Sequence, residues 1–185
     1  MFLIVGLGNP GKEYEHTKHN IGFAILNRFI ENLDNKKEYT KFNSLVVESF
    51  YRDKKLLLLK PLTFMNNSGI AVASAYRFYG SEIKSILIVH DDLDISLGEI
   101  KFKSGGGTAG HKGLESIANS LKSLDFDRLR FGIGRPPQGI EASEYVLSGF
   151  NKDEGHEVEL CIDKAVEAIK DYIDRGIDYC MNKYN

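Results

Sequence analysis

The chain has 185 residues, with 24 lysines and arginines against 26 aspartates and glutamates and a formal charge of −2. This length fits a single domain, residues 1–185, with enough chain to bury a sizeable core. The composition, 42% hydrophobic and 27% charged, is that of an ordinary soluble protein, and no apolar run approaches the about 20 residues of a membrane span. We expect no membrane association and no secretory signal. Two cysteines, Cys161 and Cys180, are too few for a disulfide framework or a zinc cluster and favour the cytoplasm.

The pattern of apolar residues predicts strands that alternate with helices. An apolar run at 1–5 predicts a strand, and helical spacing from Ile21 to Leu33 predicts a helix. A hairpin is expected over 44–60, followed by a helix over 68–79 that Gly80 ends. Strands are expected at 85–90, 99–103 and 128–134, a helix at 114–121, and a long last helix from Val158 that Gly176 closes. These elements predict a single three-layer α/β domain with a mixed β-sheet flanked by helices.

Ligands of such sheets bind beyond the carboxyl ends of the strands. We therefore expect the site to be formed by the loops that follow Val5, Lys60, Val89 and Lys103.

The first of these loops, GLGNPGKEYEHTKHN from Gly6 to Asn20, contains the G-x-G-x-x-G spacing of a dinucleotide-binding loop. Pro10 lies inside the motif and lacks an N–H group, and the helical pattern begins only near Asn20. A dinucleotide is therefore not expected. The loop is expected instead to bring Asn9 and His19 to the crevice.

Two further loops carry candidate polar groups. The segment KPLTFMNNSG brings the amide of Asn66 to the edge, with Met65 beside it as an apolar wall. The segment VHDDLD places Asp91 after the most apolar strand, where its carboxylate can accept and orient an imidazole N–H. A helix cap is the alternative role for Asn66, and a simple turn is the alternative for Asp91.

A metal site is a further alternative for these residues. His19, His90 and His111, together with the aspartates, offer metal-ligand chemistry, but their separations match no compact ligand spacing. No metal site is predicted.

Basic residues concentrate in one part of the chain. Residues 101–135 carry seven basic and three acidic side chains, a net charge of +4, whereas residues 151–185 carry five basic and nine acidic ones, a net charge of −4. The basic segment includes the glycine-rich KFKSGGGTAGHKGL, which lacks the Walker A order but resembles loops that bind phosphate or move as lids. The segment is a candidate anion-binding surface, and a merely solvated surface is the alternative.

Taken together, five segments resemble bacterial peptidyl-tRNA hydrolase. They are VGLGNPGKEYEHTKHNIGF, KPLTFMNNSG, VHDDLD, KFKSGGGTAGHKGL and RLRFGIGRP, in the order and spacing of that family over nearly the whole chain. The resemblance implies an enzyme that cleaves the ester between a peptide, or an N-blocked aminoacyl group, and the terminal ribose of tRNA, and so recycles tRNA for translation. It also implies no metal or organic cofactor, a monomer and a cytoplasmic location.

The resemblance further implies roles for individual residues. It assigns catalysis to His19 and Asp91. It assigns the substrate cleft to Asn9, Tyr14, Met65, Asn66 and Lys112, and the binding of a tRNA phosphate to Lys103 and Arg130. One position departs from the common pattern, because many members have asparagine where this chain has Lys112, and a lysine only donates hydrogen bonds.

These residue types suit ester hydrolysis by water. A histidine with an ordinary pKa of about 6.5 is mostly neutral near pH 7, so His19, oriented by Asp91, can take a proton from the attacking water. Asn9 or Asn66 can donate to the developing oxyanion, and the sequence does not distinguish between them. No serine or cysteine near His19 has a nucleophile pattern.

Two other functions stay open at this point. A module that binds tRNA without turnover would need the basic segment but not His19. A general carboxylesterase or aminopeptidase would act on substrates without tRNA. Neither alternative explains both the pair of His19 and Asp91 and the basic segment.

Overall fold

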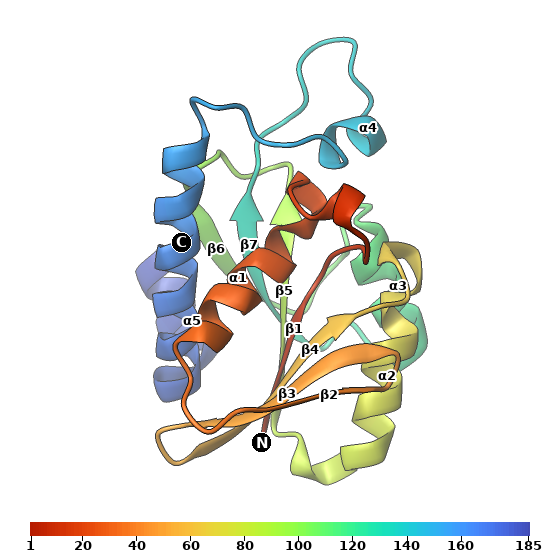
Figure 1. Cartoon of the computed structure of the whole chain (residues 1–185), viewed down its shortest axis with the longest axis vertical. Helices are drawn as coiled ribbons and strands as arrows, with labels where there is room; N and C mark the ends of the chain where they lie inside the picture. The colour runs from red at the N-terminus through yellow and green to blue at the C-terminus, as the bar shows by residue number, and fades with distance from the viewer.

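The computed structural model describes residues 1–185 and is built on one seven-stranded sheet with the order β2-β3-β4-β1-β5-β7-β6. The strands are β1 (Phe2–Gly6), β2 (Lys37–Lys41), β3 (Ser44–Tyr51), β4 (Lys54–Pro61), β5 (Ser85–Asp92), β6 (Ile100–Ser104) and β7 (Asp127–Gly132). The central strands β4, β1, β5 and β7 are parallel, whereas the β2–β3, β3–β4 and β6–β7 pairs are antiparallel. The predicted mixed sheet is confirmed (Figure 1).

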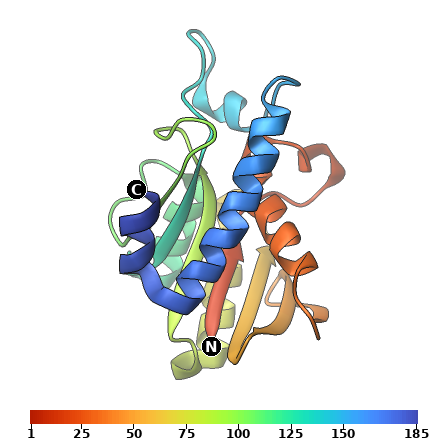
Figure 2. The same ribbon diagram turned by 90° about the vertical axis from the view of Figure 1, so that its left-hand side faces the viewer.

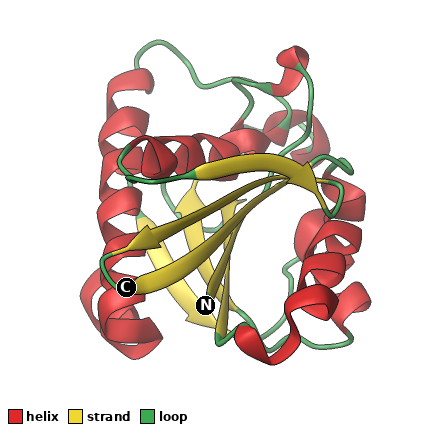
Figure 3. Ribbon diagram, turned by 60° about the horizontal axis from the view of Figure 1, so that its bottom comes forward, coloured by secondary structure: helices red, strands yellow, loops and turns green.

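Helices cover both faces of the sheet, which gives the three predicted layers (Figure 3). They are α1 (Ile21–Glu31), α2 (Ser68–Tyr79), α3 (Lys112–Leu121), α4 (Ala142–Val146) and α5 (Gly155–Tyr184). Short 3₁₀ turns lie at Lys12–Tyr14, Lys18–Asn20, Met65–Asn67 and Gly80–Glu82. On one face α1 and α5 enclose a core that includes Phe29 and Ile169, and on the other α2 and α3 enclose a core that includes Val72 and Ile117. No helix combines the length and the apolar character that a membrane span requires.

The structure differs from the sequence-based expectation at β2, α4 and the end of α5. The edge strand β2 and the short helix α4 were not expected, because β2 is mostly polar and exposed and α4 buries no residue. Helix α5 does not end at Gly176. The backbone leaves the helical region there, with φ 80° and ψ 178°, and a second helical stretch continues to Tyr184 (Figure 2). That stretch buries Cys180 and brings Asn185 to the outer edge of β6, where its side-chain amide exchanges two hydrogen bonds with the backbone of Phe102.

The glycines near the end of β1 allow α1 to lie directly against the sheet. A Cβ atom on Gly22, in the first turn of α1, would be 2.4 Å from the Val89 carbonyl oxygen and 2.5 Å from the Leu7 nitrogen. A Cβ atom on Gly6 would be 2.4 Å from the Gly22 carbonyl oxygen, so neither glycine leaves room for a side chain. Gly6, the first glycine of the dinucleotide-like motif, therefore serves helix–sheet packing, and this close approach places His19, just before α1, at the carboxyl ends of β1 and β5.

We predict that Gly22→Ala destabilises the fold. Alanine is intrinsically favoured over glycine within a helix by about 1 kcal/mol, but here its methyl group meets rigid backbone, and such overpacking typically costs about 1–3 kcal/mol. The measurement is the free energy of unfolding in urea. Gly155→Ala at the start of α5 is the matched control, because no atom lies within 4 Å of its added Cβ. Equal stability of the two variants would contradict the close approach of α1.

Candidate active site

A buried carboxylate and a histidine meet at the carboxyl end of β5. Asp91 is 2% exposed, and its Oδ1 and Oδ2 lie 2.9 and 3.0 Å from Nδ1 of His19 in the turn before α1. The neighbouring Asp92, not Asp91, has the turn role that was the alternative for the aspartates, because Asp92 Oδ1 accepts the backbone N–H of Asp94. Asp91 is instead directed at the imidazole, as the sequence predicts.

His111, at the N-terminus of α3, is a second histidine on the same carboxylate. Its Nε2 lies 3.1 Å from Asp91 Oδ1, and its Nδ1 accepts the backbone N–H groups of Gly113 and Leu114 at 3.2 and 3.4 Å. Because Nδ1 accepts, the ring proton of neutral His111 is on Nε2 and is donated to Asp91. Sequence reasoning considered His111 only as a metal ligand. The available signal was a histidine at a predicted helix start, directly after the glycine-rich loop.

The histidines keep Asp91 ionised despite its burial. Burial raises the pKa of the Asp91 carboxyl, but the charge and the N–H groups of His111 and His19 outweigh this effect and hold the pKa well below its usual range. His90 lies on the opposite face of β5, with Nδ1 donating to the Asp91 carbonyl oxygen at 2.7 Å. Burial lowers the pKa of His90 far below that of a free histidine, so this ring is neutral and adds no charge beside Asp91.

The same three side chains form a possible ligand set for a metal ion. Nitrogen atoms of His19 and His111 and an oxygen of Asp91 lie within 4.8 Å of one another, whereas His90 is outside the group. The hydrogen bonds do not favour metal binding, because His111 carries its proton on Nε2, the atom that would have to bind the ion. The arrangement fits two imidazole donors on one carboxylate.

Asn9 is held in one orientation by contacts around the end of β1. The side chain of Asn20 accepts the Asn9 backbone N–H at 2.8 Å and donates to the Asn9 carbonyl at 2.9 Å. Asn9 Oδ1 accepts the backbone N–H of Met65 at 2.7 Å, which leaves Nδ2 as its free donor. The sequence analysis missed Asn20, whose only signal there is that it is a polar residue directly after His19. The structure shows that it is buried.

A cavity of about 440 Å³ opens beside the two histidines. Its walls are formed by the end of β5, the glycine-rich loop, and α4 with Arg135; the lining residues are His19, Asp91–Asp94, Thr108–Lys112, Arg135, Ala142, Ser143 and Val146. Of the predicted site residues, only His19, Asp91 and Lys112 line it. Lys112 is exposed, and its ammonium pairs with Glu115 at 3.0 Å.

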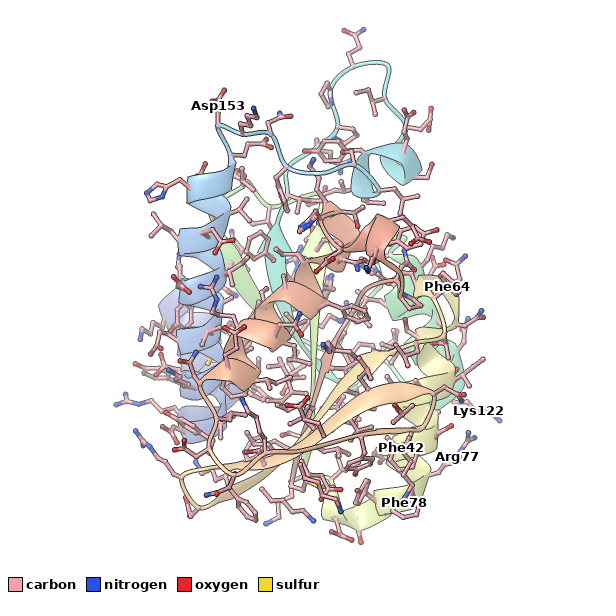
Figure 4. All side chains as sticks on the ribbon, in the orientation of Figure 1. Phe42, Phe64, Arg77, Phe78, Lys122 and Asp153 are labelled. Atoms are coloured by element: carbon pink, nitrogen blue, oxygen red, sulfur yellow. The ribbon has the colours of Figure 1, made fainter.

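The other predicted cleft residues do not line this cavity. Buried Met65 approaches Gly113 so closely that a Cβ atom there would be 2.6 Å from its Sδ. The ring of Tyr14 meets the exposed ring of Phe64 edge to face at 6.2 Å, and Phe64 is labelled in Figure 4. Asn66 is exposed and does not cap α2, since Asn67 occupies that position without a side-chain hydrogen bond.

Four basic side chains share one face of the β6–β7 pair. Register and strand alternation place them together; they are Lys101, Lys103, Arg128 and Arg130. Arg130 Nε donates to Asp92 Oδ2 at 2.8 Å, which leaves its terminal amino groups free. Arg128 is buried and donates to the carbonyl oxygens of Gly106 and Gly107, which fixes the glycine-rich loop.

The glycine-rich loop does not start where the sequence analysis placed it. Because β6 is antiparallel to β7, Ser104 lies beside Asp127, at the opposite edge of the sheet from Asp91. The expectation that all four loops leave the sheet at one edge is therefore wrong for this loop. The loop returns along the sheet to the end of β5 that carries Asp91, and His111 lies there in contact with Asp91.

We predict an acid dependence of stability that originates at Asp91. Its pKa is depressed in the folded state, so its ionised form stabilises the fold above the unfolded-state pKa of about 3.9, and this contribution is lost as the pH falls below that value. The free energy of unfolding of the wild type should therefore exceed that of Asp91→Asn most at pH 5, and the difference should shrink towards pH 3. A difference that grows on acidification would contradict the assignment.

Comparisons with known proteins agree with this geometry. The family model for peptidyl-tRNA hydrolase matches residues 3–185. The chain is 45% identical over 185 residues to the peptidyl-tRNA hydrolase of Syntrophomonas wolfei, with both chains fully covered, and 38% identical to that of Bacillus subtilis, covering 98% of the latter. The crystal structure of peptidyl-tRNA hydrolase from Acinetobacter baumannii superposes with a TM-score of 0.91 at 35% identity and covers all of this chain and 94% of the other. The chain belongs to the peptidyl-tRNA hydrolase family.

Proposed function

We propose that the chain hydrolyses the ester of peptidyl-tRNA by general-base catalysis, with Nε2 of His19 as the base. The observation that carries this proposal is the contact of His19 Nδ1 with both oxygens of Asp91. An ionised carboxylate only accepts, so the proton of neutral His19 is on Nδ1 and the Nε2 lone pair is free.

The reaction follows from this proton arrangement. Nε2 of His19 takes a proton from water while the water oxygen attacks the ester carbonyl, and the imidazolium that forms is stabilised by Asp91. The tetrahedral intermediate then expels the ribose oxygen, which recovers the proton from Nε2. The products are a free peptide carboxylate and tRNA with its terminal hydroxyl restored. No covalent enzyme intermediate and no metal ion are required.

We propose Asn9 as the donor to the oxyanion. Its side-chain amide is already oriented by the Met65 backbone N–H and its backbone is held by Asn20, and a donor that is fixed before the reaction stabilises developing charge without reorganising. Asn66 has no hydrogen bond that orients its side chain. We propose that Asn66 borders the peptide together with Tyr14, Met65 and Lys112, of which Lys112 lines the cavity.

The basic face of β6 and β7 supports phosphate binding. Lys103 is half-buried beneath the glycine-rich loop, since a Cβ on Gly106 would be 2.8 Å from its Cε. Arg130 keeps its terminal amino groups free. We propose that these two side chains bind a phosphate of the tRNA.

We also propose that the chain acts as a monomer in the cytoplasm. The substrate arises in translation, and the two cysteines are buried free thiols, which suits a reducing compartment.

We predict that His19→Ala abolishes general-base catalysis. The rate of tRNA release from an N-blocked aminoacyl-tRNA should fall by about 10²–10⁴, because this is the usual contribution of a positioned base. The assay contains EDTA, so that a contaminating metal ion does not supply the activity. His16→Ala is the control, because His16 is exposed, lies three residues earlier and makes no side-chain hydrogen bond.

Three results are informative in this assay. Equal rates for wild type and His19→Ala would remove His19 as the base. Binding of tRNA without release by the wild type would favour a binding module. Release of simple esters at the same efficiency as the aminoacyl-tRNA would favour a general esterase.

We predict that Lys103→Gln and Arg130→Gln each weaken tRNA binding and flatten its salt dependence. Each contact with a phosphate releases about one counterion, so the slope of log K against log salt should fall in magnitude by about 1 per variant. Binding of uncleaved substrate analogue is measured between low and physiological salt. Lys164→Gln on the acidic α5 is the control, and an unchanged slope in both test variants would exclude the phosphate role.

A further inference from the structure

We propose that Lys18 is a positioning residue that holds the α4 segment as the substrate-facing wall of the active-site cavity. This inference rests on the proposed function. It concerns the residue directly before His19, and it assigns a role to the segment 142–150, which the catalytic proposal does not use.

The Lys18 side chain is enclosed by residues of the α4 segment, 142–150. Lys18 is 3% exposed, and its Nζ donates to Ser148 Oγ at 3.1 Å and to the carbonyl oxygen of Gly149. The same nitrogen lies 4.6 Å from the ring centre of Tyr145 and 5.0 Å from that of Phe150. All four partners come from residues 145–150, so one side chain binds the whole segment.

This buried ammonium has no carboxylate partner. Its hydrogen bonds go to neutral oxygens, and Glu154 acts only at longer range, while burial lowers the pKa of Lys18. An uncompensated buried charge is a poor source of stability, since its desolvation is costly. A positional role accounts for the cation better than a stabilising one, because ammonium donors and the faces of two aromatic rings fix the geometry of the segment.

Three side chains of the α4 segment, Tyr145, Val146 and Phe150, are partly buried against the main core, and its other attachments are few. Helix α4 buries no residue and has no side-chain cap. Besides the Lys18 side chain, the Lys18 backbone N–H donates to the Ser148 carbonyl at 3.0 Å, Thr17 forms an isolated bridge with Gly149, and the Tyr145 hydroxyl donates to the Ile133 carbonyl at 2.8 Å. In Figure 1, α4 lies beyond the strand ends, above the turns that precede α1.

The wall that this segment supplies faces the catalytic pair. Ala142, Ser143 and Val146 line the same cavity as His19 and Asp91. The substrate group beside the ester must enter this space for the carbonyl to reach His19. We infer that the wall contributes binding of that group, so that loss of its anchor raises KM and leaves kcat nearly intact.

The test compares Lys18→Met with Lys18→Arg and with Lys12→Met, an exposed lysine as the control. Steady-state kinetics on an N-blocked aminoacyl-tRNA should show KM raised about tenfold in Lys18→Met, the size expected when a hydrogen bond to a charged group is lost, with kcat changed less than about twofold. Lys18→Arg keeps the cation and should recover most of the affinity. Hydrogen exchange of amides 142–150 should be faster in Lys18→Met.

A second variant distinguishes an effect of Lys18 through the α4 segment from a direct effect of Lys18 on the neighbouring His19. Tyr145→Leu removes one of the two aromatic rings that contact the Lys18 ammonium, at a position far from His19 in the sequence. It should also raise KM, and the double variant with Lys18→Met should raise it by less than the two single effects combined, because both changes break the contact between the Lys18 ammonium and the Tyr145 ring.

The remaining outcomes contradict the inference. A fall in kcat at unchanged KM in Lys18→Met, or additive effects of the two changes, would mean that Lys18 acts through His19 or not through the segment. If Lys18→Met does not fold, an unchanged KM in Tyr145→Leu would overturn the inference by itself. Failure of the proposed function is distinguishable, because the wild-type protein would then have no activity.

Discussion

A buried carboxylate that receives two imidazole N–H groups is the interaction on which this site depends. Asp91 takes them from His19, 72 residues earlier, and from His111, 20 residues later, so one side chain joins three parts of the chain. The carboxylate in turn fixes the tautomer of each ring, which is why His19 presents an unprotonated Nε2.

This arrangement depends on backbone packing at positions that have no side chain. His19 reaches Asp91 only because Gly6 and Gly22 let α1 touch the ends of β1 and β5. Gly113, two residues after His111, lies against Met65, whose sulfur would be 2.6 Å from a Cβ atom at that position. Of these three glycines only Gly6 belongs to the motif that resembles a nucleotide-binding loop, and the helix–sheet contact explains it without a ligand.

The sequence predicts those helices and strands whose own residues carry a clear hydrophobic pattern. The periodicity of α1 and α2 and the apolar run of β5 identify these elements, and the motif order identifies His19 and Asp91. The polar strand β2 and the helix α4 have no such signal. The direction of β6 is set by its pairing with β7, and the role of His111 is set by a contact with Asp91 that depends on that direction. Neither follows from neighbouring residues, because both are tertiary contacts.

Two buried cations contact the two loops whose residues line the cavity. Arg128 donates to carbonyl oxygens of the glycine-rich loop and lies against the Phe126 ring, and Lys18 does the same for the segment after α4 with Tyr145 and Phe150. Loops that bury little apolar surface have few other means of being fixed. Asp91 lies on the sheet, whereas these two side chains contact the loops that line the cavity. Changes in either loop can therefore alter which substrates enter while the chemistry at His19 stays the same.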